Sequence, residues 1–264
     1  MTLVQASIAD DGNSVVLIAD RLLTRRLSRD LPSYEFESAT PKILFRGNVG
    51  IGFAGLSLYA EISTRSLNKE KDFDKITGII SKCVRHEREK FIEGEVRILT
   101  GVSAKEFFTN PQLAIPPEVR ESIYGMMGEF DIECNAVVAG FDKNNKARIA
   151  VVDEDGDIVE VTPFGFASIG TGSPFSIVYF DQHGYDTRMK RNEAIVFAFE
   201  AKKWAEAHTG VGDRTDILVF DKGKKPISIY DDNEKMKQLR NAYEVELKKH
   251  RQMRVALYQK VFKN

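Results

Sequence analysis

The residue best placed to do chemistry stands directly behind the initiator methionine. Once Met1 is removed, Thr2 would carry a nucleophilic side-chain oxygen (Oγ) and a basic α-amine within one residue. An α-amine titrates near pH ~8, so part of it is unprotonated at neutral pH and can take the hydroxyl proton. This is the threonine form of the paired nucleophile and base of nucleophilic catalysis. Because many chains begin with Met-Thr, the rest of the sequence has to supply the supporting groups.

A nucleophilic threonine of this kind needs three kinds of support. A nearby cation keeps the amine neutral near pH ~7, an acidic residue positions that cation, and backbone N–H groups hold the oxyanion of a tetrahedral intermediate. The sequence offers Asp20 at the end of a hairpin's return strand and Lys42 at the head of the next strand. Gly55 stands at a strand-to-helix turn, and Thr171 lies in a second glycine-rich turn.

Each of these residues also has an ordinary structural interpretation. Asp20 could be a solvated turn residue, and Lys42 a surface lysine, because Lys is seldom buried without a partner. Thr171 and Ser173 could cap the helix expected from about Pro174. It is the combination with an N-terminal threonine that favours a reactive site.

The elements that must position these residues come in runs of strands and runs of helices. The expected strands are 2–8, 15–19, 42–45, 49–53, 132–141, 147–152, 158–161, 166–169, 216–220 and 227–230, and the expected helices are 56–69, 73–97, 174–182, 192–207 and a tail from 233 onward. Such segregation favours an α+β fold in which packed sheets are flanked by layers of helices. The polar stretch from Arg25 to Thr40 is interpreted as a loop.

Two stretches fall outside this arrangement. Residues 98–130 are interrupted by prolines, of which Pro116 and Pro117 could open a short helix, and we interpret them as an insertion. The end of the chain indicates a helix, so we divide the protein into a main domain, 1–230, and a C-terminal helical extension, 231–264. The extension has apolar residues at helical spacing with basic residues between them. Packing on the body or on a neighbouring subunit is favoured over binding to nucleic acid or another acidic partner.

Composition excludes several classes of protein. The 264 residues are 42% hydrophobic and 29% charged with a net charge of −1, which favours neither nucleic acid nor a membrane surface as a partner. The apolar runs are too short to span a bilayer. Two distant cysteines, Cys83 and Cys134, and no signal peptide indicate a cytoplasmic protein without a disulfide framework. No metal or cofactor is expected, because the histidines lack metal-site spacing and the acidic turn 153–157 lacks the arrangement of a calcium loop.

Eight motifs of the chain, in order, resemble proteasome β-type subunits. They are Thr2-Leu3-Val4, Ala19-Asp20-Arg21 with Thr24, Lys42-Ile43-Leu44-Phe45, Gly52-Phe53-Ala54-Gly55-Leu56, Val138-Ala139-Gly140-Phe141-Asp142, Asp153-Glu154-Asp155-Gly156, Ile169-Gly170-Thr171-Gly172-Ser173-Pro174 and Asp216-Ile217-Leu218-Val219. Each motif alone is weak, and their common order from Thr2 to about Asp221 is what makes them specific. The β-type is favoured over the α-type because no helical extension precedes the first strand.

The resemblance implies the four-layer αββα sandwich of the N-terminal-nucleophile (Ntn) hydrolases. It also implies that Thr2 is the nucleophile and terminal base. Lys42 would be the lysine that lowers the pKa of the amine, and Asp20 the acidic partner of that lysine. Gly55 would supply the N–H of the oxyanion hole, and Thr171 falls where the family usually has a serine near the amine.

One pair of positions departs from the family. His208 and Val211 occupy the offsets at which the family usually has an acidic residue and a serine. Thr209 or Asp213 could replace them after a small shift. The bacterial two-component branch of the family also lacks the pair, so the departure does not by itself imply inactivity.

The expected function is that of a threonine-type peptidase that cleaves peptide bonds through an acyl-enzyme on Thr2. An amidase or transpeptidase with a non-protein or specific peptide substrate is the first alternative, and a non-catalytic scaffold subunit is the second. The resemblance implies a peptide or protein substrate and a symmetric ring or other homo-oligomer, with a regulatory ATPase as a possible further partner. The substrate and the number of subunits are left open.

Overall fold

The computed structural model of the chain describes residues 2–25, 34–110, 112–129, 132, 134–207 and 210–262. Its centre is two five-stranded antiparallel sheets. The first has the order β10 (Phe166–Ile169), β1 (Val4–Ala9), β2 (Ser14–Asp20), β11 (Thr215–Asp221) and β12 (Ile227–Ile229). The second has the order β5 (Ile43–Arg46), β6 (Val49–Gly55), β7 (Cys134–Phe141), β8 (Ala147–Val152) and β9 (Ile158–Glu160).

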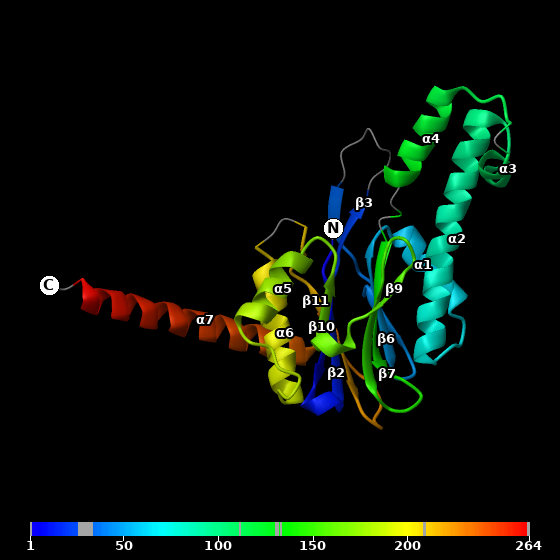
Figure 1. The fold of residues 1–264 in the computed structure, drawn as a ribbon. Coiled ribbons are helices and arrows are strands. Elements are labelled where there is room, and N and C mark those ends of the chain that lie inside the picture. Colours follow the sequence, from blue (N-terminus) through cyan, green and yellow to red (C-terminus); the bar gives the residue numbers. More distant parts are fainter. Residues whose placement is uncertain are drawn as a thin grey trace.

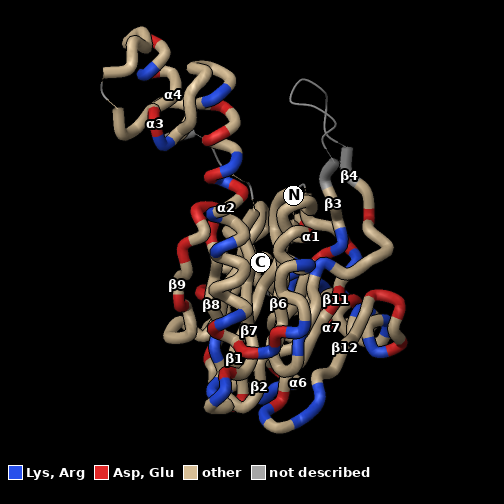
Figure 2. Tube along the Cα trace, turned by 90° about the vertical axis from the view of Figure 1, so that its right-hand side faces the viewer, with Lys and Arg blue, Asp and Glu red and all other residues tan. Residues whose placement is uncertain are grey.

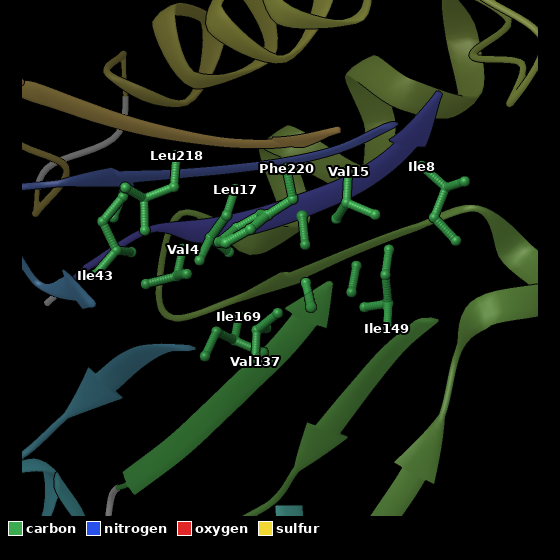
Figure 3. Packing of buried hydrophobic residues seen from close by; sticks show 14 of the residues in the cluster. Val4, Ile8, Val15, Leu17, Ile43, Val137, Ile149, Ile169, Leu218 and Phe220 are labelled. Carbon is green, nitrogen blue, oxygen red and sulfur yellow. The ribbon is translucent and has the colours of Figure 1, made fainter. Parts of the chain in front are cut away.

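The two sheets pack face to face through a continuous apolar core. Val4 and Leu17 from the first sheet meet Val137 and Ile149 from the second, and all four are fully buried (Figure 3). In β2 the residues from Val15 to Ala19 form an unbroken apolar run because both faces of the sheet are covered, whereas β1 alternates and buries the polar residues Gln5 and Ser7. This inter-sheet core fixes β1, and with it the position of the residue that precedes β1.

Helices cover the outer face of each sheet (Figure 1). The helices are α1 (Ser57–Ser66), α2 (Phe73–Thr100), α3 (Ala104–Thr109), α4 (Pro117–Glu129), α5 (Ser173–Gln182), α6 (Arg191–Ala205) and α7 (Glu234–Val261). One face of α2, with Phe73, Ile76 and Ile80, packs on the second sheet, while α5 and α6 pack on the first. The expected four-layer αββα sandwich is therefore confirmed.

The loop predicted from Arg25 to Thr40 is wrong for residues 34–37, which form a strand, while residues 26–33 lie outside the described residues. This strand belongs to a two-stranded antiparallel pair, β3 (Leu22–Arg25) and β4 (Tyr34–Glu37), in which Leu23 faces Phe36. β4 alternates aromatic and acidic residues, but over four residues within a polar stretch this alternation is a weak signal, and among the described strands β4 pairs only with β3.

Two parts of the chain extend beyond the sandwich (Figure 1). The predicted insertion contains α3, which was not predicted, and α4, and both pack on the C-terminal part of α2. At the other end, α7 begins against the body, where Met236 is fully buried, and then continues away from it. None of the helices in the described part of the chain is long and apolar enough to cross a membrane.

Candidate active site

The β1–β2 hairpin brings the start of the chain to the end of β2. Val4 faces Ala19, and just beyond this pair the Leu3 N–H donates to Asp20 Oδ1 at 2.9 Å. The Asp20 N–H in turn donates to the Leu3 carbonyl at 3.1 Å. Asp20 is fully buried, and its Oδ2 accepts from the N–H groups of Leu22 (3.1 Å) and Gly212 (2.9 Å). A carboxylate with this many donors is held in one orientation.

Lys42, immediately before β5, reaches the same carboxylate from the other side. Its ammonium donates to Asp20 Oδ1 at 2.8 Å, to the Leu22 carbonyl and to Thr2 Oγ1. An ammonium has three N–H donors, so this set uses all of them. The structure thus brings Thr2, Asp20 and Lys42 together, with the lysine bridging the hydroxyl and the acid.

Burial governs the electrostatics of this pair. The Lys42 side chain is 6% exposed and the Asp20 side chain 0%. Desolvation lowers the pKa of Lys42 below its ordinary value of 10.5, and the Asp20 carboxylate opposes that change. The lysine is therefore buried and paired with one carboxylate, and its proton is more labile than that of a surface lysine.

The turn after β10 holds the backbone of Thr2. The Thr2 N–H donates to Thr171 Oγ1 at 3.3 Å, and the Gly172 N–H donates to the Thr2 carbonyl at 3.3 Å. Gly170 has a φ of +90°, and a Cβ there would lie 2.2 Å from the Thr2 carbonyl oxygen, so only glycine fits. The capping alternative for Thr171 and Ser173 is not what the structure shows, since the N-cap of α5 is Gly172 and no side chain caps the helix.

Gly55 ends β6 with a φ of +107°, a conformation that favours glycine, and it lines a pocket of about 390 Å³. The pocket is lined by Thr2, Leu23, Ser38, Thr40, Pro41, Lys42, Leu44, Phe53, Gly55, Ser57, Ala60, Glu61 and Thr64. The structure therefore brings the five predicted site residues together. Thr2, Lys42 and Gly55 line this pocket, Asp20 binds Lys42, and Thr171 accepts from the backbone N–H of Thr2. The pocket is a concave site of the kind that binds ligands, and it lies beside Thr2.

The segment that departs from the family pattern is partly described. His208 and Thr209 lie outside the described residues. Val211 is buried in a small apolar cluster with Leu3 and Ala205. Asp213 is exposed, and it is its backbone carbonyl, rather than its side chain, that accepts a hydrogen bond from Lys202.

Sequence analysis missed three charged residues around the site, of which Lys202 of α6 is the most deeply buried. Its ammonium donates to Glu206 and to the carbonyls of Gly212 (2.6 Å) and Asp213 (3.0 Å). These bonds hold the segment whose Gly212 N–H binds Asp20. The position of Lys202 in an expected helix gave no signal for this role.

The second missed residue is Arg21, directly after Asp20. Its guanidinium makes a bidentate pair with the buried carboxylate of Asp216 on β11, at 2.7 and 2.6 Å. Its third nitrogen donates to the Ala39 carbonyl at 3.3 Å, so the segment that leads to Lys42 is bonded to Arg21 as well. The motif Ala19-Asp20-Arg21 was noted, but the partner is 195 residues away and only the sheet brings it close.

The third missed residue is Glu37 of β4. Among the described residues its buried Oε2 has no hydrogen-bond partner, and its Oε1 lies 2.3 Å from where a Cβ on Gly212 would be. Burial, followed by the nearby carboxylates of Asp213 and Asp20, raises the pKa of Glu37 above its ordinary value of 4.5. A second carboxyl group thus stands close to the Asp20–Lys42 pair. In the described part of the chain, no group of three His, Cys, Asp or Glu residues is placed to hold a metal ion.

Comparison with known proteins agrees with this architecture. The proteasome subunit family model matches residues 119–212, which is less than half of the chain. Among solved structures, Anbu from Hyphomicrobium sp. strain MC1 superposes with a TM-score of 0.59 at 15% identity, covering 94% of this chain and 96% of that one. The protein has the proteasome-like Ntn-hydrolase fold. A mutant of the same Anbu gives a TM-score of 0.57 at 16% identity, covering 95% of this chain and 96% of that one. No curated protein matches the sequence.

Proposed function

We propose that this protein is an N-terminal threonine hydrolase that cleaves peptide or other amide bonds after removal of Met1. The observation that carries the proposal is the Lys42 ammonium, which bridges Thr2 Oγ1 and the buried Asp20 carboxylate. A buried lysine is costly unless it is paired, and a purely structural pair would not require a hydroxyl as its third partner. The fold and the match to the proteasome subunit family support the same proposal.

In the proposed reaction, Thr2 Oγ attacks the carbonyl carbon of the scissile amide and its proton passes to the freed α-amine. Lys42 and the backbone N–H of Gly55 stabilise the negative charge that develops on the oxygens. Collapse of the tetrahedral intermediate breaks the C–N bond, and the α-ammonium returns the proton to the departing amine. Water, deprotonated by the same amine, then hydrolyses the ester on Thr2 and restores the hydroxyl.

The other site residues position these groups. Asp20 keeps Lys42 charged and aimed at the hydroxyl. Thr171 accepts from the nitrogen of Thr2, where it would orient the lone pair of the amine once Met1 is gone. Because the pocket beside the hydroxyl is lined by both apolar and hydroxyl side chains, it suits a peptide side chain better than a purely apolar ligand.

The test has three readouts. The intact mass of the purified protein shows whether Met1 has been removed. A threonine-directed electrophile should then add one label per chain, and Thr2→Ala should abolish the label while the exposed control Thr109→Ala keeps it. Failure of the processed wild-type protein to react would overturn the proposal in favour of a scaffold. Incubation with an unfolded protein, with and without a competing amine, distinguishes a peptidase from an amidase or transpeptidase.

A further inference from the structure

Two parts of the chain that project from the αββα body carry opposite charge. The first is the lobe, residues 92–127, made of the end of α2 with α3 and α4. The second is the arm, residues 244–262, the distal part of α7. They extend from opposite sides of the molecule (Figure 1), and Figure 2 marks the charged residues of the lobe.

The lobe has a small core of its own. Val96, Phe107 and Ile123 are buried together, and the helices of the lobe make their main contacts with α2. Its outer surface still exposes four large apolar side chains, which are Ile98, Leu99, Phe108 and Tyr124. Of these, Phe108 and Tyr124 lie against each other, with ring centroids 6.1 Å apart, and such an exposed apolar cluster is suited to an interaction surface.

The charge of the lobe is negative. It contains five acidic and three basic residues, and two of the bases are engaged, Arg97 with Glu93 and Arg120 with the Phe107 ring and the Leu113 carbonyl. Among the described residues, Glu106, Glu118 and Glu121 make no ion pair and are exposed. A partner for this surface should therefore be apolar and basic.

The arm has that character. Met236, Leu239 and Tyr243 of α7 pack on the body, and from Glu244 to Gln259 every side chain is exposed. At least half of the surface of eight of its apolar residues is exposed, and these residues are Val245, Leu247, Met253, Val255, Leu257, Tyr258, Val261 and Phe262. An 18-residue helical segment extends about 27 Å, and a helix of that length with so much exposed apolar surface is marginal without a partner.

The arm is also basic. From residue 247 to residue 262 the sequence has Lys248, Lys249, Arg251 and Arg254 with Lys260 and no acidic residue. Beyond Glu244 and Glu246 at its start, the arm carries only basic charges, so pairing of one arm with another would oppose like charges over most of its length, which disfavours it. The apolar stripe that holds the start of α7 on the body continues into this segment at Leu247, Leu257 and Val261.

We propose that the arm of one copy of this chain seats on the lobe of a second copy. The arm supplies basic and apolar side chains, and the lobe supplies acidic and apolar ones, so charge and hydrophobicity are both complementary. Because the two surfaces are different and lie on opposite sides, the contact is head-to-tail. Repetition of such a contact generates a closed ring or an open helical array, depending on whether the rotation closes.

The experiment measures self-association of the full chain by analytical ultracentrifugation. The arm variant carries Lys248→Glu, Arg251→Glu and Arg254→Glu, and the lobe variant carries Glu106→Lys, Glu118→Lys and Glu121→Lys. A control with the same charge change as the arm variant carries Lys143→Glu, Lys146→Glu and Lys222→Glu, all exposed and outside both surfaces. Circular dichroism and thermal unfolding confirm that each variant is folded.

Each variant alone should associate at least about tenfold more weakly than the wild type and the control, because like charges then face one another. An equimolar mixture should assemble again, since the acidic arm of one variant meets the basic lobe of the other and the two unchanged surfaces also match. Association that persists in a chain ending at Tyr243 would overturn the proposal. It would also be overturned by a monomeric wild type, by an unaffected lobe variant, or by a mixture that stays monomeric.

Discussion

Replacement of Asp20 by asparagine tests the centre of the site. The two carboxylate oxygens accept four hydrogen bonds, from the N–H groups of Leu3, Leu22 and Gly212 and from the Lys42 ammonium. Each carboxylate oxygen accepts two of these bonds. Asparagine keeps one oxygen as an acceptor, and its NH₂ group replaces the other oxygen and faces two donors. Two donors therefore lose their acceptor, and the buried lysine loses its counter-ion.

The magnitude follows from burial. A buried donor left without an acceptor costs about 1–3 kcal/mol, and removal of one partner of a buried ion pair costs about 3–5 kcal/mol. Because these costs arise from the same contacts, we expect Asp20→Asn to lower the free energy of unfolding by about 3–5 kcal/mol rather than by their sum. A domain of ordinary stability, about 5–15 kcal/mol, would still fold. The loss of the carboxylate would lower the pKa of Lys42 further and remove its positive charge from the Thr2 hydroxyl.

Two assays read this prediction. Urea unfolding followed by far-UV circular dichroism gives the change in stability, with the exposed Asp181→Asn as the matched control. Labelling of Thr2 by an electrophile at neutral pH should slow by at least about 100-fold, the usual effect of losing one stabilising donor. A change within about 0.5 kcal/mol of the control would refute the reasoning.

The double variant Asp20→Asn with Lys42→Met tests whether the unpaired Lys42 ammonium causes the loss of stability. It removes the uncompensated charge, so part of the lost stability should return while labelling stays slow. If the double variant is less stable than Asp20→Asn alone, the unpaired lysine is not the source of the cost.

Three further changes test the surrounding residues. Gly170→Ala puts a methyl group 2.2 Å from the Thr2 carbonyl oxygen and should abolish labelling of Thr2. The control Gly184→Ala, at a φ of +68° with open space around it, should preserve labelling. Equal labelling of the two variants would contradict the proposed fit of Gly170 against Thr2. The raised pKa of Glu37 means that the folded state binds this proton more tightly than the unfolded state, so wild-type stability falls as pH rises above 4.5 through the folded pKa. Glu37→Gln should therefore have the higher melting temperature at neutral pH, and the two curves should converge below about pH 4, as thermal scans across pH can check. Lys202→Met removes the donor of the Gly212 carbonyl, whereas the Asp213 carbonyl still accepts from Thr215 and Arg240. It should cost about 1–3 kcal/mol in urea unfolding together with a slower labelling rate, and an unchanged rate would show that the loop does not position the site.

The parts of the fold that the sequence predicted are those governed by local pattern. The β1–β2 hairpin and the helices on the body follow from apolar periodicity and turn residues, and the hairpin alone places Asp20 beside the start of the chain. The position of Lys42 depended on the family resemblance, because nothing local specifies that its ammonium turns inward. The catalytic roles of both residues stay predictions.

What the sequence did not predict depends on contacts between distant segments. Arg21 pairs with Asp216 only because β2 and β11 are neighbours in the sheet, and a charged residue in an expected strand gives no sign of its partner. Lys202 resembles any helical lysine until the fold buries it. The β3–β4 pair was missed for the same reason, since its strands are stabilised by each other rather than by a strong pattern of their own.

The segment that departs from the family pattern contacts the proposed site through its backbone. Here the Asp20 carboxylate is bound by the backbone N–H of Gly212, so this contact does not depend on the side chain at the position where the family has a serine. A Cβ at Gly212 would lie 2.3 Å from Glu37 Oε1 and 2.8 Å from Leu22 Cβ, and the absence of a side chain is therefore what lets the backbone approach. Val211 fills the space beside it with apolar packing against Leu3, the residue directly before β1. The proposed chemistry thus rests on backbone donors and one buried ion pair, and neither is visible as a motif in the sequence of this segment.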